Sequence, residues 1–216
     1  MSNDRSGVPD KGGKKILKFA EDSFGSDSYT FQLIDSDTNI VIREVTDHTG
    51  YHTCGFVSDN GDLAIYMTFD KNWYFNPIIN IWNLRTDKVQ TIMTKHHPQS
   101  IWMEMAYANR PGKLFLGGVD GSLSAHNIKA LSSLWYFERE ERSFDHPNRC
   151  VAISGNGQLV CAVEEDSLSV LEFGTGKIIM RHPISIKAVD CGFQDKDQSV
   201  FVVNERSERE FIRINN

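Results

Sequence analysis

The stretch 120-DGSLSAHNI-128 aligns without gaps on 165-EDSLSVLEF-173, and both contain Ser-Leu-Ser after a polar turn. After the turn, apolar and polar side chains alternate, which is the pattern of a half-buried strand. The two stretches begin 45 residues apart. A match at this spacing indicates a repeated β unit of about 45 residues.

Strand ends repeat at a similar spacing along the rest of the chain. An apolar residue followed by a polar one closes a strand at Ile34-Asp35, Trp82-Asn83, His126-Asn127, Leu171-Glu172 and Ile214-Asn215. The second members of these pairs are separated by 48, 44, 45 and 43 residues. A strand-turn-strand segment also repeats, as 54-CGFVSDNGDL-63, 150-CVAISGNGQL-159 and more loosely 191-CGFQDKDQSV-200. Four short strands in about 45 residues are typical of one blade of a β-propeller.

These features resemble a degenerate WD-repeat β-propeller over roughly residues 15–216. The resemblance is carried by a turn acid, by the closing Trp82-Asn83 pair and by the histidine that opens each repeat. The histidines are His48, His97, His146 and His182, and the turn acids are Asp120 and Glu165. The resemblance implies a hydrogen-bonded structural network in the second repeat, made by His48, Thr68, Asp70 and Trp82. His126 and Leu171 stand at the tryptophan position of the next two repeats.

The predicted fold is therefore all-β, with about four and a half to five four-stranded blades. A flexible tail is expected over residues 1–14, because its composition buries little apolar surface. The repeat units are approximately 15–47, 48–95, 96–145, 146–181 and 182–216. The first and last units contain only three predicted strands each. We consider a five-bladed ring in which residues 16–20 complete the last blade, part of a larger ring, or a truncated product.

Composition limits the classes of partner. The 216 residues include 40% hydrophobic side chains, and the formal net charge is −6 with a pI of about 5.6. Nucleic acid and anionic membranes need a broad cationic surface, so neither is an expected partner. No apolar run reaches the roughly 18 residues of a membrane span, and the first 15 residues lack the apolar stretch of a secretory signal. We expect a cytoplasmic or nuclear protein.

The cysteines do not form a recognisable metal-binding or catalytic motif. Cys54, Cys150 and Cys191 occupy corresponding places in three repeats, and Cys161 lies in an apolar run. Equivalent positions belong to separate blades, so we expect buried core thiols that form neither a disulfide nor a metal site. None of the common nucleophile, zinc-protease, phosphate-loop or dinucleotide motifs is present in the sequence. The sequence thus predicts no enzyme and no cofactor.

Two insertions exceed the repeat pattern and suggest a protein-interaction scaffold. The first, 70-DKNWYFNP-77, places Trp73, Tyr74 and Phe75 on a loop, and aromatic side chains are frequent interface anchors. The second, 138-EREERSFDHP-147, offers Arg139 and Arg142 to an acidic segment of a protein or peptide partner. Alternatively, the aromatic side chains fold onto their own blade and the charged loop is simply solvated.

Two further hypotheses concern partners. The segment 81-IWNLR-85 resembles the ending by which some WD-repeat proteins dock on the adaptor of a cullin ubiquitin ligase, with Trp82 and Arg85 as the matching residues. Asn83 replaces the acid of that motif. In addition, incomplete first and last blades leave strand edges that invite a homo-oligomer or a partner chain completing the propeller.

Overall fold

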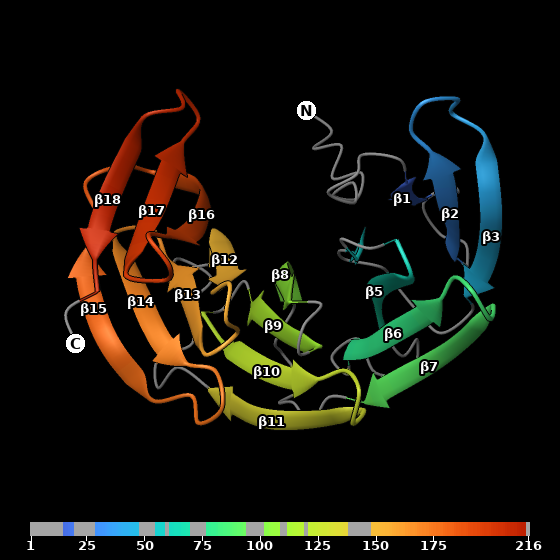
Figure 1. Cartoon of the computed structure of the whole chain (residues 1–216), viewed down its shortest axis with the longest axis horizontal. Helices are drawn as coiled ribbons and strands as arrows, with labels where there is room; N and C mark the ends of the chain where they lie inside the picture. Colours follow the sequence, from blue (N-terminus) through green and yellow to red (C-terminus); the bar gives the residue numbers. More distant parts are fainter. Residues whose placement is uncertain are drawn as a thin grey trace. The chain divides into compact units, whose positions relative to one another are not determined.

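The computed structural model describes residues 15–19, 29–47, 55–58, 61–69, 77–93, 102–108, 112–118, 121–137 and 148–214. These residues form eighteen strands in five antiparallel sheets (Figure 1). The chain divides into two compact units, Met1–Gln99 and Ser100–Asn216. The described residues contain no helix of the length and apolarity needed to cross a bilayer.

The first unit contains a three-stranded and a four-stranded sheet, each in chain order. The three-stranded sheet consists of β1 (Lys15–Phe19), β2 (Tyr29–Asp35) and β3 (Val41–Asp47). The four-stranded sheet consists of β4 (Gly55–Val57), β5 (Leu63–Phe69), β6 (Pro77–Asn83) and β7 (Lys88–Met93).

The proposal that residues 16–20 complete the last blade is wrong. Instead, β1 pairs with β2 inside the first unit, and Leu17 lies opposite Leu33. Both leucines are buried in a core that β1 and β2 share with β4, β5 and β6. Because this local pairing buries the apolar face of β1, the first sheet has three strands rather than two.

The second unit contains two four-stranded sheets and one three-stranded sheet. The first consists of β8 (Trp102–Ala108), β9 (Lys113–Gly118), β10 (Leu123–Asn127) and β11 (Ser132–Phe137). The second consists of β12 (Cys150–Ile153), β13 (Leu159–Val163), β14 (Ser167–Glu172) and β15 (Ile178–Pro183). The third consists of β16 (Ala188–Gln194), β17 (Ser199–Asn204) and β18 (Arg209–Arg213).

One backbone hydrogen bond recurs in four sheets and fixes the register of the repeat. The amide that follows the third strand donates to the carbonyl that precedes the second strand, over 2.8 to 2.9 Å. The four bonds are Leu84 to Asp62, Ile128 to Gly112, Phe173 to Gln158 and Ile214 to Gln198. The repeats 120–128 and 165–173 therefore occupy equivalent places, as the sequence predicts.

The strand register also shows that the last repeat ends at different residues from those that the sequence predicts. Arg213 lies opposite Ser199 as Glu172 lies opposite Leu159, so Ile212-Arg213 corresponds to the earlier strand endings. The predicted assignment of Ile214-Asn215 is wrong by two residues. The last period is shorter because only residues 184–187 connect β15 to β16.

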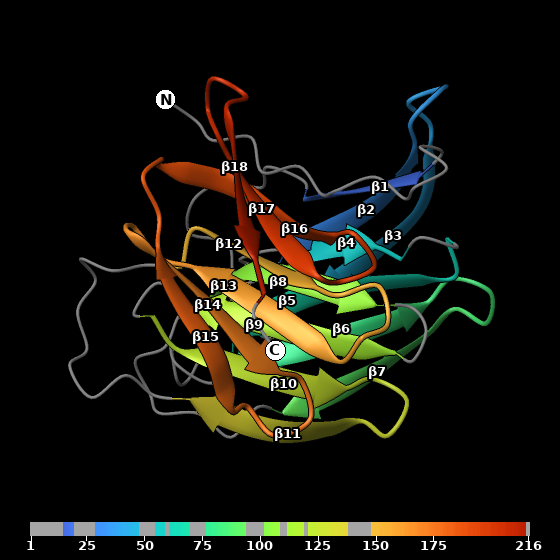
Figure 2. The ribbon, with the colours of Figure 1, turned by 60° about the vertical axis from the view of Figure 1, so that its left-hand side comes forward.

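Neighbouring sheets of the second unit lie side by side (Figure 2) and bury apolar faces against each other. Alternate residues of β13 and β14 point to opposite faces of their sheet. One face, with Val160 and Leu171, packs on Phe115 of the sheet before it. The other, with Val163 and Val170, packs on the β16–β18 sheet. The β12–β15 sheet is thus covered on both faces.

Close contacts join neighbouring sheets. A Cβ atom on Gly117 would lie 2.8 Å from Cγ1 of Val151, so the glycine allows the two sheets to approach closely. The ammonium of Lys113 donates to the carbonyl oxygen of Gly157 and lies 4.6 Å from the centroid of the Phe173 ring. In the first unit, Lys15 makes the equivalent bond to Gly61 at 3.2 Å.

Candidate interaction surface

The β16–β18 sheet presents one uncovered face, which we call the open face and define by Phe201, Arg209, Phe211 and Arg213. Its opposite face packs on β12–β15 through Val200, Val202 and Ile212. Phe211 is opposite Phe201 in the strand register, and its exposed fraction is 56%. The equivalent third-strand side chains of the other sheets are Ile81, Ala125 and Val170, exposed by 3%, 0% and 0%. The last sheet alone among these four therefore exposes its central apolar position.

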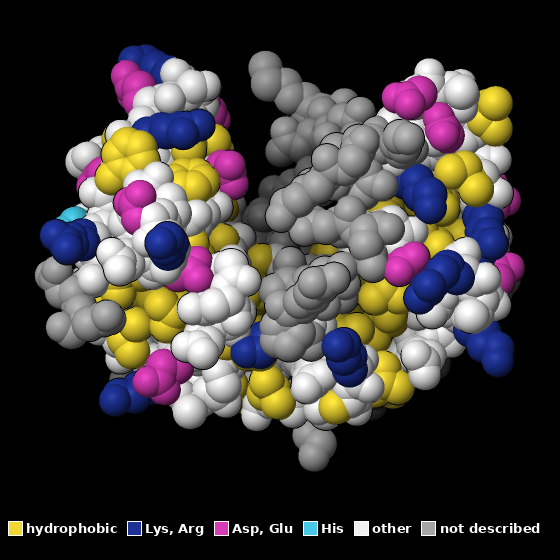
Figure 3. Space-filling view, viewed as in Figure 1, with side chains coloured by type: hydrophobic (Ala, Val, Ile, Leu, Met, Phe, Trp, Pro, Cys, Tyr) yellow, Lys and Arg dark blue, Asp and Glu magenta, His cyan; other side chains and the backbone are white. Residues whose placement is uncertain are grey.

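Two cations flank the exposed ring. Arg209 and Arg213 are both exposed, and in a strand they share a face with Phe211. The guanidinium carbon of Arg209 lies 5.7 Å from the centroid of the Phe201 ring. Neither arginine forms an ion pair within the described part of the chain. Figure 3 shows basic and hydrophobic side chains next to one another over this sheet.

A pocket of about 380 Å³ adjoins the open face at the end of β18. Phe211 and Arg213 line it together with polar groups of the β16–β17 turn. Within that turn, Ser199 donates a hydrogen bond of 2.6 Å to the carboxylate of Asp195. The pocket thus combines an aromatic ring, a cation and a carboxylate that is already hydrogen-bonded.

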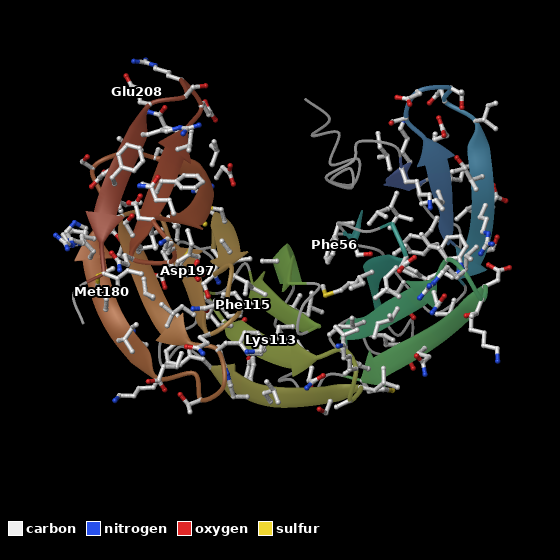
Figure 4. All side chains as sticks on the ribbon, in the orientation of Figure 1. Phe56, Lys113, Phe115, Met180, Asp197 and Glu208 are labelled. Atoms are coloured by element: carbon white, nitrogen blue, oxygen red, sulfur yellow. The ribbon has the colours of Figure 1, made fainter. Side chains whose placement is uncertain are left out.

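The β17–β18 hairpin is fixed by the side chain of Asn204. Its Oδ1 accepts hydrogen bonds from the amides of Arg206 and Glu208, each at 3.0 Å. Its Nδ2 donates to the Glu208 carboxylate at 2.6 Å, and Figure 4 shows Glu208 near the tip of this hairpin. A fixed turn sets the strand register and so places Phe211 on the open face.

Further contacts anchor this sheet to β12–β15. Glu210 accepts hydrogen bonds from the amide and the hydroxyl of Ser185, at 2.9 and 2.8 Å. At the β16–β17 turn, the Asp197 carboxylate accepts from the amides of Gly155 and Asn156, at 2.8 and 3.0 Å (Figure 4). The sheet that carries the open face is therefore hydrogen-bonded to the β12–β13 turn of its neighbour and, at Glu210, to the connection that follows β15.

The described hydrogen-bond partner of Trp82 lies outside the predicted network. The indole N–H of Trp82 donates to Oδ1 of Asp87 at 2.9 Å, and Arg43 donates to the same oxygen at 3.0 Å. Thr68 accepts from the side-chain amide of Asn80 at 2.9 Å. The turn after β6 carries Asp87 back over the indole, so a local acid satisfies the only indole donor. The other predicted members, His48 and Asp70, lie outside the described residues.

His126 takes the tryptophan position in the third repeat, as predicted, and forms a different network. Its Nε2 lies 2.7 Å from Oγ of Ser124, and its Nδ1 lies 3.0 Å from Oγ of Ser133. His182 does not open a repeat: it is exposed within β15, opposite Leu168. The outer strand β15 runs from Ile178 to Pro183 and therefore includes this histidine.

The segment 81-IWNLR-85 divides into buried and exposed parts. Trp82 is 1% exposed and packs against the β1–β2 side of its unit, so it offers little surface to a partner. Arg85 has 74% of its side chain exposed, and its Nε lies 3.4 Å from the Asp62 carboxylate. Within this segment, Arg85 is the side chain that a partner can reach.

Three of the four cysteines are buried core thiols, as expected, but they lie together although Cys150 and Cys191 belong to different repeats. Cys150, Cys161 and Cys191 are buried in one cluster, as free thiols. The Cys161 thiol donates to Sγ of Cys191 at 3.8 Å. Hydrogen bonding to Cys150 and Cys161, together with burial, raises the pKa of the Cys191 thiol well above its ordinary value of 9.0. They converge because β12 and β13 belong to one sheet and the β16–β18 sheet packs directly on it.

These thiols are not arranged as a metal site. Within the residues that the structure describes, no group of three cysteine, histidine or acidic side chains has suitable geometry for a metal ion. Protonated thiols bind metals poorly, since the thiolate is the ligand. The cluster therefore acts as apolar packing between two sheets.

The predicted loop residues lie outside the part of the chain that the structure describes. They are Trp73, Tyr74, Phe75, Arg139 and Arg142. The open face was not predicted, although the sequence identifies 209-REFIRI-214 as a strand. Shifting the last repeat by two residues aligns Phe211 with Val170, which places an aromatic residue at a position that is buried in the other repeats.

Comparison with known proteins supports the fold alone. No family model matches the sequence, and no curated protein does. Among solved structures, the chain is similar to Kluyvelomyces marxianus Hsv2, with a TM-score of 0.62 and 11% sequence identity. The match covers 94% of this chain and 60% of that chain, so this chain spans about three fifths of Hsv2. The repeated antiparallel sheets and this likeness show that the chain has a β-propeller fold.

Proposed function

We propose that this chain is a non-catalytic scaffold, a WD-repeat-like propeller that binds a protein or peptide. The observation that carries the proposal is the 56% exposure of Phe211 at a position that is buried in the other sheets. Fully burying an exposed phenylalanine gains roughly 1.5–3 kcal/mol from the hydrophobic effect, and burying the exposed part of this ring gains roughly half of that. The flanking Arg209 and Arg213 belong to a residue type that is enriched in protein interfaces.

A site-specific photo-crosslinking experiment tests this function. A benzophenone amino acid replaces Phe211 in the full chain, and a matched variant carries it at Leu134, an exposed apolar residue of an outer strand. After irradiation in cells, we expect the variant with benzophenone at Phe211 to crosslink to discrete proteins. The variant with benzophenone at Leu134 should crosslink to none of these proteins. Absence of specific crosslinks at Phe211 would contradict the proposed function for this surface.

The aromatic loop and the charged loop are each proposed as a further contact with a partner. Trp73, Tyr74 and Phe75 would supply apolar anchors, and Arg139 and Arg142 would pair with acidic side chains of the partner. A benzophenone amino acid at Tyr74 should then crosslink a protein, and the combined Arg139→Ala and Arg142→Ala changes should reduce its yield. An unchanged yield would remove the arginines from the contact.

Docking on a cullin-ligase adaptor is a second candidate, favoured by the 74% exposure of the Arg85 side chain. In this proposal Arg85 is the contact, and the buried Trp82 only positions the turn. A pull-down with purified adaptor should lose binding on Arg85→Ala. Equal retention of the adaptor by the variant and the parent would exclude the candidate.

A further inference from the structure

The outer edge of β18 differs from the equivalent edges of the other sheets. In the described register, β18 is the third strand of its sheet, equivalent to β6, β10 and β14. Each of those third strands pairs with a following strand, which is β7, β11 or β15. Within the described ranges, β18 pairs with β17 alone. A strand edge with unpaired backbone groups is a template for another strand.

The direction of the backbone groups on this edge follows from one hydrogen bond. The amide of Ile214 donates to Gln198 on the β17 side. Because successive amides of a strand point to opposite sides, Ile212 and Glu210 also direct their amides toward β17. The amides and carbonyls of Phe211 and Arg213 therefore point outward, where an added antiparallel strand would meet them.

The side chains beside this edge specify what the added strand should carry. Arg209, Phe211 and Arg213 alternate along β18 and lie on the open face. An antiparallel neighbour places one residue opposite each of them, and opposite-charge and apolar pairs across strands are stabilising. The complementary sequence pattern is thus acidic-x-apolar-x-acidic.

We propose that β18 accepts an extended segment of a partner protein with this acidic-apolar pattern as a fourth antiparallel strand. The proposal rests on the proposed scaffold function and specifies one of its binding sites. A second copy of this chain fits less well. If two β18 strands paired antiparallel about Phe211, each Arg209 would lie opposite an Arg213, and directly opposed like charges are destabilising.

A peptide series tests strand addition on the full chain. The probe is a fluorescein-labelled peptide, Thr-Glu-Val-Leu-Val-Glu-Thr, and fluorescence anisotropy reports its binding. With leucine opposite Phe211, the leucine amide points at β18 and the valine amides point away. Methylating the leucine nitrogen should weaken binding about tenfold or more, because it removes one hydrogen bond and leaves the Phe211 carbonyl unpaired. Methylating one valine nitrogen is the matched control and should leave affinity within about twofold.

Charge reversal tests the side-chain complementarity. The double variant Arg209→Glu, Arg213→Glu should bind the acidic peptide about tenfold more weakly. It should gain affinity for the peptide in which lysine replaces both glutamates. Circular dichroism checks that both proteins are equally folded, and the exposure of the two arginines makes this the expected result.

Three outcomes would overturn the proposal. They are no saturable binding up to about 1 mM peptide, equal effects of the two methylations, and equal binding of acidic and basic peptides by the parent chain. Light scattering adds a fourth: self-association that the peptide abolishes would assign the edge to a second copy. If Phe211 crosslinks persist in cells while methylation has no selective effect, strand addition fails and the scaffold function stands.

Discussion

The indole of Trp82 donates its hydrogen bond to Asp87, a residue five positions along the chain in the turn after β6. The same carboxylate oxygen accepts from Arg43 of β3, on the neighbouring sheet. Asp87 has a positive φ of 60°, a conformation that asparagine and aspartate tolerate better than most residues. Asp87 thus adopts the backbone conformation that the turn needs, accepts the hydrogen bond of a buried tryptophan and links two sheets.

Replacing Asp87 with glycine should lower the free energy of unfolding by about 1–2 kcal/mol, because the indole loses its acceptor. Glycine adopts the positive φ without strain, so the effect reports the lost side chain. Asp87→Asn keeps an acceptor oxygen and should cost about 0.5 kcal/mol or less, from the exposed pair with Arg43. Urea unfolding measures both, and equal effects would show that the indole bond contributes nothing.

Phe211 and Val170 occupy equivalent positions, but truncation should cost much more stability at Val170 than at Phe211. Val170→Ala removes buried methyl groups and should cost about 1–3 kcal/mol of unfolding free energy. Phe211→Ala removes a larger side chain but should change it by about 0.5 kcal/mol or less, since the ring is exposed. Urea unfolding compares the two variants. A large loss from Phe211→Ala would mean that the ring packs within the folded chain.

Gly117 and Gly174 form a second matched pair. An added Cβ at Gly117 would meet Val151 at 2.8 Å and Asn148 at 2.9 Å, whereas one at Gly174 meets nothing within 4 Å. Gly117→Ala should therefore destabilise the fold by about 1–3 kcal/mol through overpacking. Gly174→Ala should stay within about 0.5 kcal/mol of the parent. Thermal unfolding of both variants checks this, and similar melting temperatures would refute the close packing at Gly117.

The raised pKa of Cys191 predicts a loss of stability in alkaline solution. In the unfolded chain this thiol ionises near 9.0, and in the folded chain it ionises at higher pH. The folded state then binds more protons above pH 9, so the free energy of unfolding falls as pH rises toward the folded pKa. Below pH 9 the contribution is fully present.

The Cys191→Ala variant isolates this contribution from other titrating groups. Urea unfolding at pH 8, 9 and 10 should show a shallower pH dependence for the variant than for the parent chain. Parallel curves would show that the thiol titrates alike in both states. In the parent, the buried cluster should also react with a thiol reagent only on unfolding, because reaction needs an exposed thiolate.

Much of the architecture could be predicted from local pattern. The third strands that close at Asn83, Asn127 and Glu172 lie where the sequence places them. Strand alternation has a period of two residues and turn residues mark its ends, so both are readable without knowing any partner strand. The repeat spacing then supplies the order of strands within each sheet.

The candidate site could be identified only once the strand register of the last sheet was known. The strand at 209–213 was predicted, but its repeat position was assigned two residues too late. A two-residue shift in the alignment changes which residues are taken as equivalent. Phe211 stands out as exposed only when it is compared with the buried residues Ile81, Ala125 and Val170. The short connection before β16 hides this relation from spacing alone.

The sequence by itself determined an all-β chain of four-stranded repeats, because alternation and turns are properties of neighbouring residues. Only the tertiary structure decided that β1 pairs with β2, that Cys150, Cys161 and Cys191 meet, and that Asp87 satisfies Trp82. Those outcomes depend on which faces of which sheets pack together. Local patterns do not distinguish between several possible pairings of strands and sheet faces, and long-range packing determines which of them form. The same packing leaves Phe211 exposed on the last described sheet.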